Sequence, residues 1–464
     1  MKNYIADIER ALYDVRDVDK SLYKSDAGLT EEIIRDISAR KHDPPWMLEF
    51  RLKSLEVYRS IDLPTWGADI SELNMDEIVT YVKPNAAQVN DWSQVPDEIK
   101  RTFDRLGIPD AEKKSLAGVG AQYDSEVVYH SVQKRLTDLG VVYTDMETAL
   151  VEHEDIVREY FMTLVPPKDH KFAALHGAVW SGGSFVYVPA GVDVKIPLQS
   201  YFRLNAAGAG QFEHTLIIVE PGAKLHFIEG CSAPRYNVTN LHAGCVELFI
   251  KEGARLRYST IENWSRNMMN LNTKRALVER DGLIEWVSGS FGSHVSMLYP
   301  CSVLHGEGAR AEFTGVTFAG KGQNLDTGAI VIHAAPKTSA NINTRTISKS
   351  GGAATYRSAV KVTKNAPFAK CSVNCESLML DDKSRSDTLP VMDVEGDEAD
   401  IGHEAKIGRI SEEAIFYLMA RGISEAEARA MIVRGFVEPI AKELPLEYAV
   451  EMNNLINLEL EGQL

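Results

Sequence analysis

Cys371 and Cys375 lie four residues apart, a spacing that first suggests a metal site in this sequence. Thiolates bind soft metal ions at metal–sulfur distances of about 2.3 Å. On a β-strand, however, four residues at about 3.3 Å each separate the two cysteines by about 13 Å, which one ion cannot bridge. We therefore expect at most one of the two cysteines to belong to a given metal site.

His403 and Glu404 follow the acidic run from Asp393 to Asp400, where we expect a hinge between strands and C-terminal helices. Adjacent charged and polar side chains are most often solvated surface groups. A thiolate, a carboxylate and an imidazole brought together would nevertheless suit a transition metal ion. The sequence thus leaves both interpretations of this pair open.

Gly315 to Gly322 nearly matches a phosphate-binding loop. Such a loop needs a serine or threonine after its lysine to hold Mg²⁺, and a helix must follow. Here Gly322 follows Lys321, and the surrounding pattern is typical of strands. We therefore expect that the chain does not hydrolyse ATP by itself.

A ladder of short strands from Phe172 to Leu380 must position these residues. A glycine turn followed by alternating residues recurs along it every 26 to 31 residues. The turn glycines are Gly191, Gly222, Gly253, Gly282 and Gly308. A fixed period of this kind predicts a repeat architecture.

Within each repeat, apolar residues alternate with charged ones, as at Leu225 and Phe227 or at Leu256 and Tyr258. This alternation is typical of half-buried strands. One repeat cannot bury its apolar face alone, whereas stacked coils shield one another. We therefore expect a mainly β fold with a β-helix or related solenoid, and a jelly roll or sandwich is the alternative.

Helical patterns flank the ladder on both sides. In the N-terminal part, we expect helices at the apolar stripe of Ile5, Ile8 and Leu12 and from Ser125 to Leu139. We expect three parts: an N-terminal helical region (1–165), a β-helix core (166–392) and a C-terminal helical domain (393–464).

Ser411 and Ser424 are predicted N-caps of two short C-terminal helices, and a third helix follows Pro445. These three amphipathic helices could cap the open end of a solenoid. They could equally form a docking platform for another protein. The sequence alone does not separate the two roles.

The composition excludes several classes of protein. The 464 residues suffice for two or three domains, and the net charge of -16 disfavours nucleic acid as a partner. The N-terminus has no apolar signal region, and no run of about 18 apolar residues predicts a membrane span. Five cysteines, an odd number, fit a reducing compartment, so we expect a cytoplasmic protein.

Several longer stretches resemble one family closely, and together they cover nearly the whole chain. They include Gly118–Asp124, Gly183–Pro189, Tyr201–Asn205, Ile228–Pro234, Thr273–Leu277, Cys375–Leu378, His403–Ala405, Arg421–Ser424 and Glu443–Glu447. The Ile-Glu-Gly-Cys-Ser-Ala-Pro stretch is the most specific. The sequence is thereby identified as similar to the SufB family, the scaffold subunits of the Suf iron-sulfur cluster assembly system.

The resemblance implies a right-handed parallel β-helix core between the two helical parts. It also implies a scaffold rather than an enzyme, with ATP hydrolysis supplied by the partner SufC and with SufD or a second copy of this chain as a further subunit. Sulfur would come from the cysteine desulfurase SufS with SufE or SufU. The implied cofactors are a transient iron-sulfur cluster and, in the complex, a reduced flavin.

Site residues carry over from the resemblance by position. Cys375, His403 and Glu404 match the cluster site of the family, and Cys231 matches the cysteine that accepts sulfur. From the Gly-Cys-Ser sequence at Cys231 we expect an accessible turn. Residues matching the route between the two cysteines are Arg203, Asn205, Glu262, Trp264 and Lys274.

Two positions depart from the family pattern. Glu262 stands where the family often has glutamine, and this adds a negative charge to the route. Gly402 replaces an acidic residue found in some members, and this leaves Glu404 as the main carboxylate candidate. The competing functions are a β-helix enzyme acting on polysaccharides or acyl groups, and a purely structural solenoid.

Overall fold

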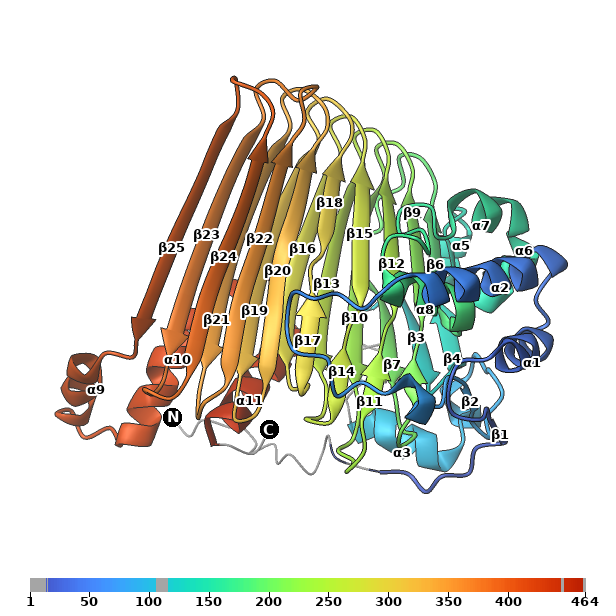
Figure 1. Cartoon of the computed structure of the whole chain (residues 1–464), viewed down its shortest axis with the longest axis horizontal. Coiled ribbons are helices and arrows are strands. Elements are labelled where there is room, and N and C mark those ends of the chain that lie inside the picture. The colour runs from blue at the N-terminus through green and yellow to red at the C-terminus, as the bar shows by residue number, and fades with distance from the viewer. Residues whose placement is uncertain (1–13, 15, 106–115, 444–445, 462–464) are drawn as a thin grey trace.

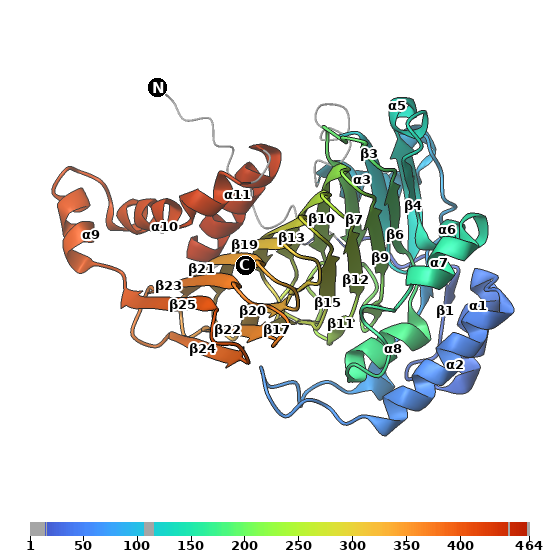
Figure 2. The same cartoon turned by 90° about the horizontal axis from the view of Figure 1, so that it is seen from above.

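The computed structural model describes residues 14, 16–105, 116–443 and 446–461. Its centre is a β-solenoid of about eight turns, in which parallel strands stack along one axis (Figure 1). Helices of the N-terminal part cover one end, and helices of the C-terminal part lie near the other (Figure 2). The predicted β-helix is confirmed, and the jelly roll is excluded because neighbouring coils pair in parallel.

Two long sheets form the walls of the solenoid. The first sheet runs, in spatial order, through β25 (Asp400–Arg409), β23 (Lys370–Met379), β21 (Ser339–Ser348), β19 (Arg310–Ala319), β16 (Leu283–Phe291), β13 (Arg255–Asn263), β10 (Lys224–Ser232), β7 (Leu198–Arg203), β3 (Gly118–Tyr123) and β4 (Glu126–Val132).

The second sheet bends, so that its early coils contribute two short strands each. Its members are β5 (Val142–Thr144), β6 (Gly183–Val188), β8 (Gly210–Gln211), β9 (His214–Val219), β11 (Asn240–His242), β12 (Cys245–Ile250), β14 (Met268–Asn270), β15 (Thr273–Val278), β17 (Val295–Leu298), β18 (Cys301–Leu304), β20 (Asn324–His333), β22 (Ala353–Val362) and β24 (Arg385–Val394). A separate small sheet pairs β1 (Tyr23–Lys24) with β2 (Val82–Lys83).

The register of the first sheet explains the alternation in the sequence. Phe227 pairs with Tyr258, and Tyr258 pairs with Trp286, so one apolar residue of each coil lies on that of the next. The ring centroids are 5.6 Å apart at both steps of this column. Burying each aromatic side chain stabilises the fold by about 1.5–3 kcal/mol. These columns fill the interior between the two sheets.

N-terminal helices cover the outer face of the second sheet. They are α1 (Glu31–Lys41), α2 (Pro45–Ser60), α6 (Met146–Glu152), α7 (Glu154–Tyr160) and α8 (Lys171–Val179). Helix α3 (Asp97–Arg105) lies on the first sheet, and Leu136 of α5 (Lys134–Thr137) packs into the core between the two sheets. Every residue of α8 after Lys171 is buried. Helix α8 therefore packs closely between the other N-terminal helices and the solenoid.

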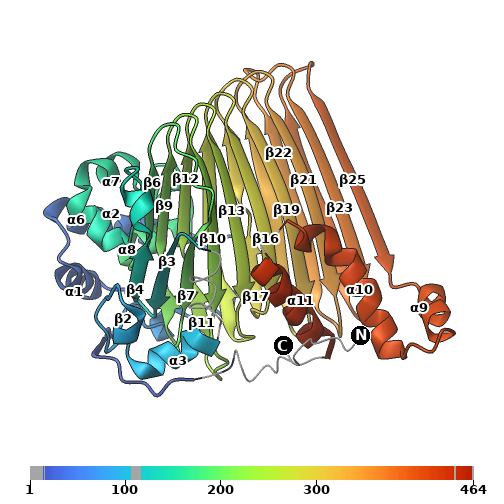
Figure 3. The ribbon, with the colours of Figure 1, turned by 180° about the vertical axis from the view of Figure 1, so that it is seen from behind.

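Three helices follow the last strand: α9 (Glu412–Met419), α10 (Glu425–Ala441) and α11 (Leu446–Glu461). Helices α10 and α11 lie across the outer face of the first sheet, as Figure 3 shows. Ser411 and Ser424 cap α9 and α10 through hydrogen bonds from the backbone N–H groups of Ala414 and Glu427, as the sequence predicts. Helix α9 projects beyond β25 (Figures 1 and 2).

Some expectations differ from the structure. The predicted helix from Ser125 to Leu139 is wrong, because Glu126–Val132 forms β4 and pairs with β3 at the N-terminal edge of the first sheet. Strands of the two long sheets extend from Gly118 to Arg409, beyond the range 166–392 on both sides. The apolar stripe at Ile5 lies outside the described residues.

Two smaller expectations concern single segments. Strand β19 ends at Ala319, and Gly320 to Gly322 form a turn before β20, so no helix follows Lys321 and the segment is not a phosphate-binding loop. No helix in the described part of the chain is long and apolar enough to cross a membrane.

Candidate functional site

Cys231 lies inside the solenoid. It belongs to β10 and shares the inward face with Phe227 and Glu229, and only 1% of its surface is exposed. The expectation of an accessible turn is therefore wrong. The glycine at position 230 is explained by packing and not by a turn, because a Cβ atom there would come within 2.5 Å of the Tyr201 ring. Burial, followed by the charge of Glu229, raises the pKa of the Cys231 thiol well above its usual value.

Lys274 is buried between two carboxylates in the same interior. Its Nζ atom lies 2.9 Å from Glu229 Oε1 and 3.6 Å from Glu262 Oε1, and it donates a hydrogen bond to Thr260 Oγ1 at 3.1 Å. Burial lowers the pKa of Lys274, but the two carboxylates outweigh burial and raise it. Burial raises the pKa of Glu262, and Lys274 only partly opposes that shift. The Lys274 ammonium group therefore supplies the positive charge that stabilises both buried carboxylates.

The buried network continues from Glu262 to the next corner of the solenoid. Asn270 donates a hydrogen bond to Glu262 Oε2 at 2.7 Å, and its Oδ1 atom lies 2.7 Å from His242 Nδ1. His242 Nε2 faces Glu213 Oε1 at 2.5 Å, and the His242 ring packs against Trp264 with centroids 4.7 Å apart. Burial lowers the pKa of His242, but Glu213 outweighs burial and raises it. A chain of charged and polar groups thus surrounds Cys231.

Arg203 and Asn205 lie at the margin of this network. Arg203 pairs in register with Ser232 and donates a hydrogen bond to Ser232 Oγ at 3.0 Å, which places it on the face opposite Cys231. Asn205 is 5% exposed, and its Oδ1 atom accepts a hydrogen bond from the Asp17 backbone at 3.2 Å. The structure therefore brings Glu262, Trp264 and Lys274 together inside, while Arg203 and Asn205 lie toward the outside.

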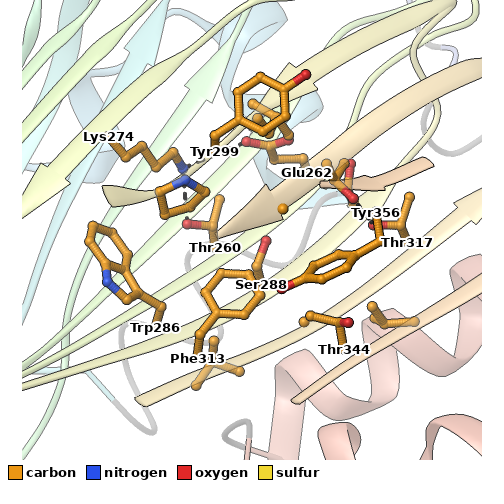
Figure 4. A pocket seen from close by; sticks show the side chains of 18 of the residues that line it. Thr260, Glu262, Lys274, Trp286, Ser288, Tyr299, Phe313, Thr317, Thr344 and Tyr356 are labelled. Carbon is orange, nitrogen blue, oxygen red and sulfur yellow. Dashed lines mark hydrogen bonds and ion pairs between the residues drawn. The ribbon is translucent and has the colours of Figure 1, made fainter. Parts of the chain in front are cut away.

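A small cavity extends from Lys274 along the solenoid axis (Figure 4). Its volume is about 30 Å³, enough for one or two water molecules. Hydroxyl groups from successive coils line it alongside aromatic rings: Thr260, Ser288, Thr317, Thr327, Thr344 and Tyr356. The polar interior around Cys231 and Lys274 therefore extends toward the last coils of the solenoid.

Cys375 lies one strand beyond this cavity. It pairs in register with Thr344 and faces inward, with 2% of its surface exposed. His403 on β25 points to the same side, and its Nε2 atom lies 3.3 Å from Cys375 Sγ. Burial raises the pKa of Cys375 to about 11 and lowers the pKa of His403. A neutral thiol and a neutral imidazole therefore face each other near the open end of the solenoid.

Glu404 points the other way. It pairs in register with Asn374 on the outer face, and its carboxylate binds Lys406 Nζ at 3.1 Å with 60% of the Glu404 side chain exposed. His403 and Glu404 lie inside the last strand, so the predicted hinge at this position is wrong. The sequence did not predict strand β25, because most of its side chains are exposed and apolar residues do not alternate with polar ones along it.

Cys371 shares β23 and its inward face with Cys375, as expected if both lie on one strand. Burial raises the pKa of Cys371 to about 12. The two cysteines are four positions apart on the strand, about 13 Å, so the thiol of Cys371 does not belong to the Cys375 pair.

Sequence reasoning missed Glu213, Glu229 and His242, although they complete the interior network. The signal for Glu229 was available, because it alternates with Phe227 and Cys231 on one strand face. Glu213 and His242 offered no such signal, since each lies at a corner between short strands and their pairing joins different coils.

We expect Lys274→Met to lower the free energy of unfolding by about 3–5 kcal/mol, because the change leaves two buried carboxylates without their cation. Without the ammonium group, the folded-state pKa of Glu262 rises further above its unfolded value. Such a carboxyl stabilises the fold while protonated, and this contribution is lost as pH rises through the folded-state pKa. Denaturant unfolding should therefore show a larger deficit at about pH 8 than at about pH 5.

The matched control is Lys251→Met, which removes a partly exposed ion pair with Glu279. This control should change the unfolding free energy by less than about 1 kcal/mol. Equal losses in both variants, or no pH dependence in Lys274→Met, would contradict the role given to Lys274.

Comparison with known proteins shows which family the chain belongs to. The SufBD core domain of the SUF iron-sulfur cluster assembly system matches residues 202–436, and the SufBD protein N-terminal region matches residues 38–200. The chain is 51% identical to the iron-sulfur cluster assembly protein SufB of Bacillus subtilis strain 168, over 100% of both chains. It is 52% identical, over 97% of both chains, to iron-sulfur cluster assembly SufBD family proteins of Staphylococcus aureus strains MRSA252 and NCTC 8325. With two family models matching most of its length and these relatives matching nearly all of it, the chain belongs to the SufBD family.

Proposed function

We propose that this chain is the cytoplasmic scaffold on which nascent iron-sulfur clusters are assembled in a Suf system. It is not itself an enzyme in this proposal, and the cluster is its cargo. The observation that carries the proposal is the position of Cys231 and Cys375, two buried thiols on inward strand faces with a polar interior between them. The similarity to the iron-sulfur cluster assembly protein SufB of Bacillus subtilis supports it.

Cys231 is the sulfur acceptor in this account, with SufS and its carrier SufE or SufU as donor. The Cys231 thiolate attacks the outer sulfur of the donor persulfide. The sulfur–sulfur bond of the donor breaks, the donor leaves as a thiolate, and Cys231 becomes a persulfide, so the step needs no external oxidant. Because Cys231 is 1% exposed, we expect the Asp17 segment over Asn205 to open during delivery.

Lys274 gives the interior its affinity for anionic sulfur. Its ammonium group opposes the carboxylates around Cys231 and partly offsets the rise that burial and these carboxylates cause in the pKa of the Cys231 thiol. Glu262 departs from the family pattern, yet its carboxylate is bound by Lys274 and by Asn270. Its negative charge is thereby compensated, and we expect it not to block sulfur passage toward the cavity.

Cys375 and His403 are the ligands that this chain offers to the cluster. A cluster held by thiolates takes four ligands, so two must come from elsewhere. The thiol of Cys375 must lose its proton on binding iron, so affinity should fall as pH falls. Glu404 has a different role from these two ligands. Its carboxylate faces outward and can reach a cluster only from the outer side of β25.

The last coil supplies a surface for the partner subunit. Within the described residues, β24 pairs only with β22 and β25 only with β23, which leaves two strand edges open. Four apolar side chains of β24 are more than two-fifths exposed: Leu389, Val391, Met392 and Val394. Open edges with exposed apolar residues invite strand addition. We infer that SufD or a second copy of this chain pairs here, next to Cys375.

Helix α9 is the proposed contact for SufC. Phe416 is 73% exposed and Tyr417 is 57% exposed, and both lie on a helix that packs little against the solenoid. Exposed aromatic side chains are common anchors of protein interfaces. The C-terminal helices then have two roles: α10 and α11 cover the first sheet, and α9 binds the ATPase. The reduced flavin stays a prediction from the resemblance, and this proposal does not depend on it.

Anaerobic reconstitution with iron and sulfide tests the cluster site. We expect Cys375→Ser and His403→Asn to lose the iron-sulfur absorbance, because each removes a ligand atom of the inward pair. Cys371→Ser is the matched control on the same strand face and should reconstitute as the unchanged chain does. Circular dichroism of each variant should stay unchanged.

Glu404→Gln separates the inward pair from the outer carboxylate. It should reduce the absorbance less than Cys375→Ser does. Equal loss in both, or full absorbance in Cys375→Ser, would overturn the ligand assignment, and an unchanged chain that never becomes coloured would favour a purely structural solenoid.

Phe416→Ser tests the SufC contact. Truncation after Ile410 would also remove α10 and α11 and thereby uncover the first sheet, whereas this substitution leaves them in place. We expect the affinity for SufC, measured by titration calorimetry, to fall about thirtyfold, the effect of losing an anchor worth about 2 kcal/mol. Val238→Ser, at a residue 49% exposed far along the chain, should bind as the unchanged protein does. Undiminished binding of Phe416→Ser would place the contact elsewhere.

A further inference from the structure

Three potential metal ligands meet at the junction between α8 and the second sheet, and nothing in the proposed function uses them. They are His176 on α8, His214 at the start of β9 and Cys245 at the start of β12. One ligand atom from each lies within 4.8 Å of the other two, and all three side chains are buried. His214 and Cys245 pair in register, so the neighbouring strands hold them side by side.

The hydrogen bonds of the two imidazoles leave a gap that a cation would fill. His176 Nδ1 lies 3.0 Å from the carbonyl oxygen of Ala243, which only accepts, so this nitrogen carries the hydrogen and His176 Nε2 carries a lone pair. His176 Nε2 lies 3.0 Å from His214 Nδ1. On the far side of its ring, His214 Nε2 lies 3.3 Å from Glu247 Oε2.

No arrangement with two neutral rings and an ionised Glu247 pairs both nitrogens of His214. If His214 carries its hydrogen on Nε2, toward Glu247, then two lone pairs face each other at 3.0 Å. If it carries the hydrogen on Nδ1, a lone pair faces the buried Glu247 carboxylate. A positive charge between or on the rings removes the conflict. It is either a metal ion or an added proton.

We propose that His176, His214 and Cys245 bind one zinc ion. The ligand set decides between metal and proton, because a protonated histidine pair gives no reason for a cysteine sulfur within 4.8 Å of both ring nitrogens. Imidazole nitrogen and thiolate sulfur are the usual zinc ligands, at about 2.0–2.1 Å and about 2.3 Å. Ligand atoms 3.0–4.8 Å apart are compatible with one ion between them. A water molecule fills the fourth position in three-ligand zinc sites.

The surroundings suit a bound cation. Glu247 stands behind His214, as carboxylates stand behind zinc-binding histidines in many proteins. Glu247 is itself held in place, because its two oxygens accept hydrogen bonds from the backbone N–H groups of Met162, Leu164 and Val165. The Phe161 ring packs on the His214 ring with centroids 4.3 Å apart and shields the site from water.

The charges at the site also balance. One divalent ion with one thiolate leaves a single positive charge, which the neighbouring Glu247 carboxylate offsets. Burial and Glu247 raise the pKa of the free Cys245 thiol, so zinc must displace its proton on binding. The ion would join α8 to both β9 and β12, and thereby fix the N-terminal helices to the solenoid. This structural role is independent of the proposed scaffold function.

Metal analysis of the full chain, produced with zinc present and purified without chelators, tests the proposal. We expect about one zinc per chain in the unchanged protein and in Cys375→Ser. Cys245→Ser and His176→Asn should lose the zinc while circular dichroism stays unchanged. Zinc retained in Cys245→Ser but lost in Cys375→Ser would place the metal on the Cys375 pair and overturn the proposal.

X-ray absorption at the zinc edge decides the matter even where the Cys245 and His176 variants do not fold. In zinc-loaded Cys375→Ser, we expect one sulfur and two imidazole ligands around the ion. Cobalt substitution of the same variant should give a thiolate-to-cobalt charge-transfer band. A spectrum without sulfur, or a folded unchanged chain that takes up no zinc, would show that the histidine pair holds a shared proton instead.

Discussion

The interior of a solenoid is shielded from bulk water, so the polar groups that alternation places there depend on partners from neighbouring coils. Lys274 meets this constraint by lying between Glu229 and Glu262, each from a different coil. Burying charges costs free energy that a purely apolar interior would not need to offset. The apolar columns that include Phe227 hold the coils in register, and that register keeps the charged groups paired. The polar interior, and the proposed path for sulfur, both depend on it.

Much of the fold could be predicted because its signals are local or periodic. The glycine turns and the alternation around Leu225 and Phe227 predicted stacked strands, and the register of β10 with β13 confirms them. The serines at 411 and 424 act as caps within four residues of their partners. The recognised sequence stretches led to the family, which the comparisons establish.

The candidate site was harder to predict, because its geometry depends on pairing between coils. Gly230 suggested a turn at Cys231, whereas the glycine is needed for the close approach of the Tyr201 ring. The contact of Cys375 with His403 joins residues 28 apart, one full coil, which no local pattern reveals. The opposite orientation of Glu404 follows from strand parity, which could not be applied until β25 was known to be a strand.

The central claim is that sulfur enters at Cys231 and reaches Cys375 through the interior of this chain. Isotope-labelled sulfur supplied by SufS and its carrier, followed over time by mass spectrometry of the two cysteine peptides, tests it most directly. The account predicts label first at Cys231 and later at Cys375, with neither peptide labelled in Cys231→Ser and only the first labelled in Cys375→Ser. Label at Cys375 in the Cys231→Ser protein would contradict it.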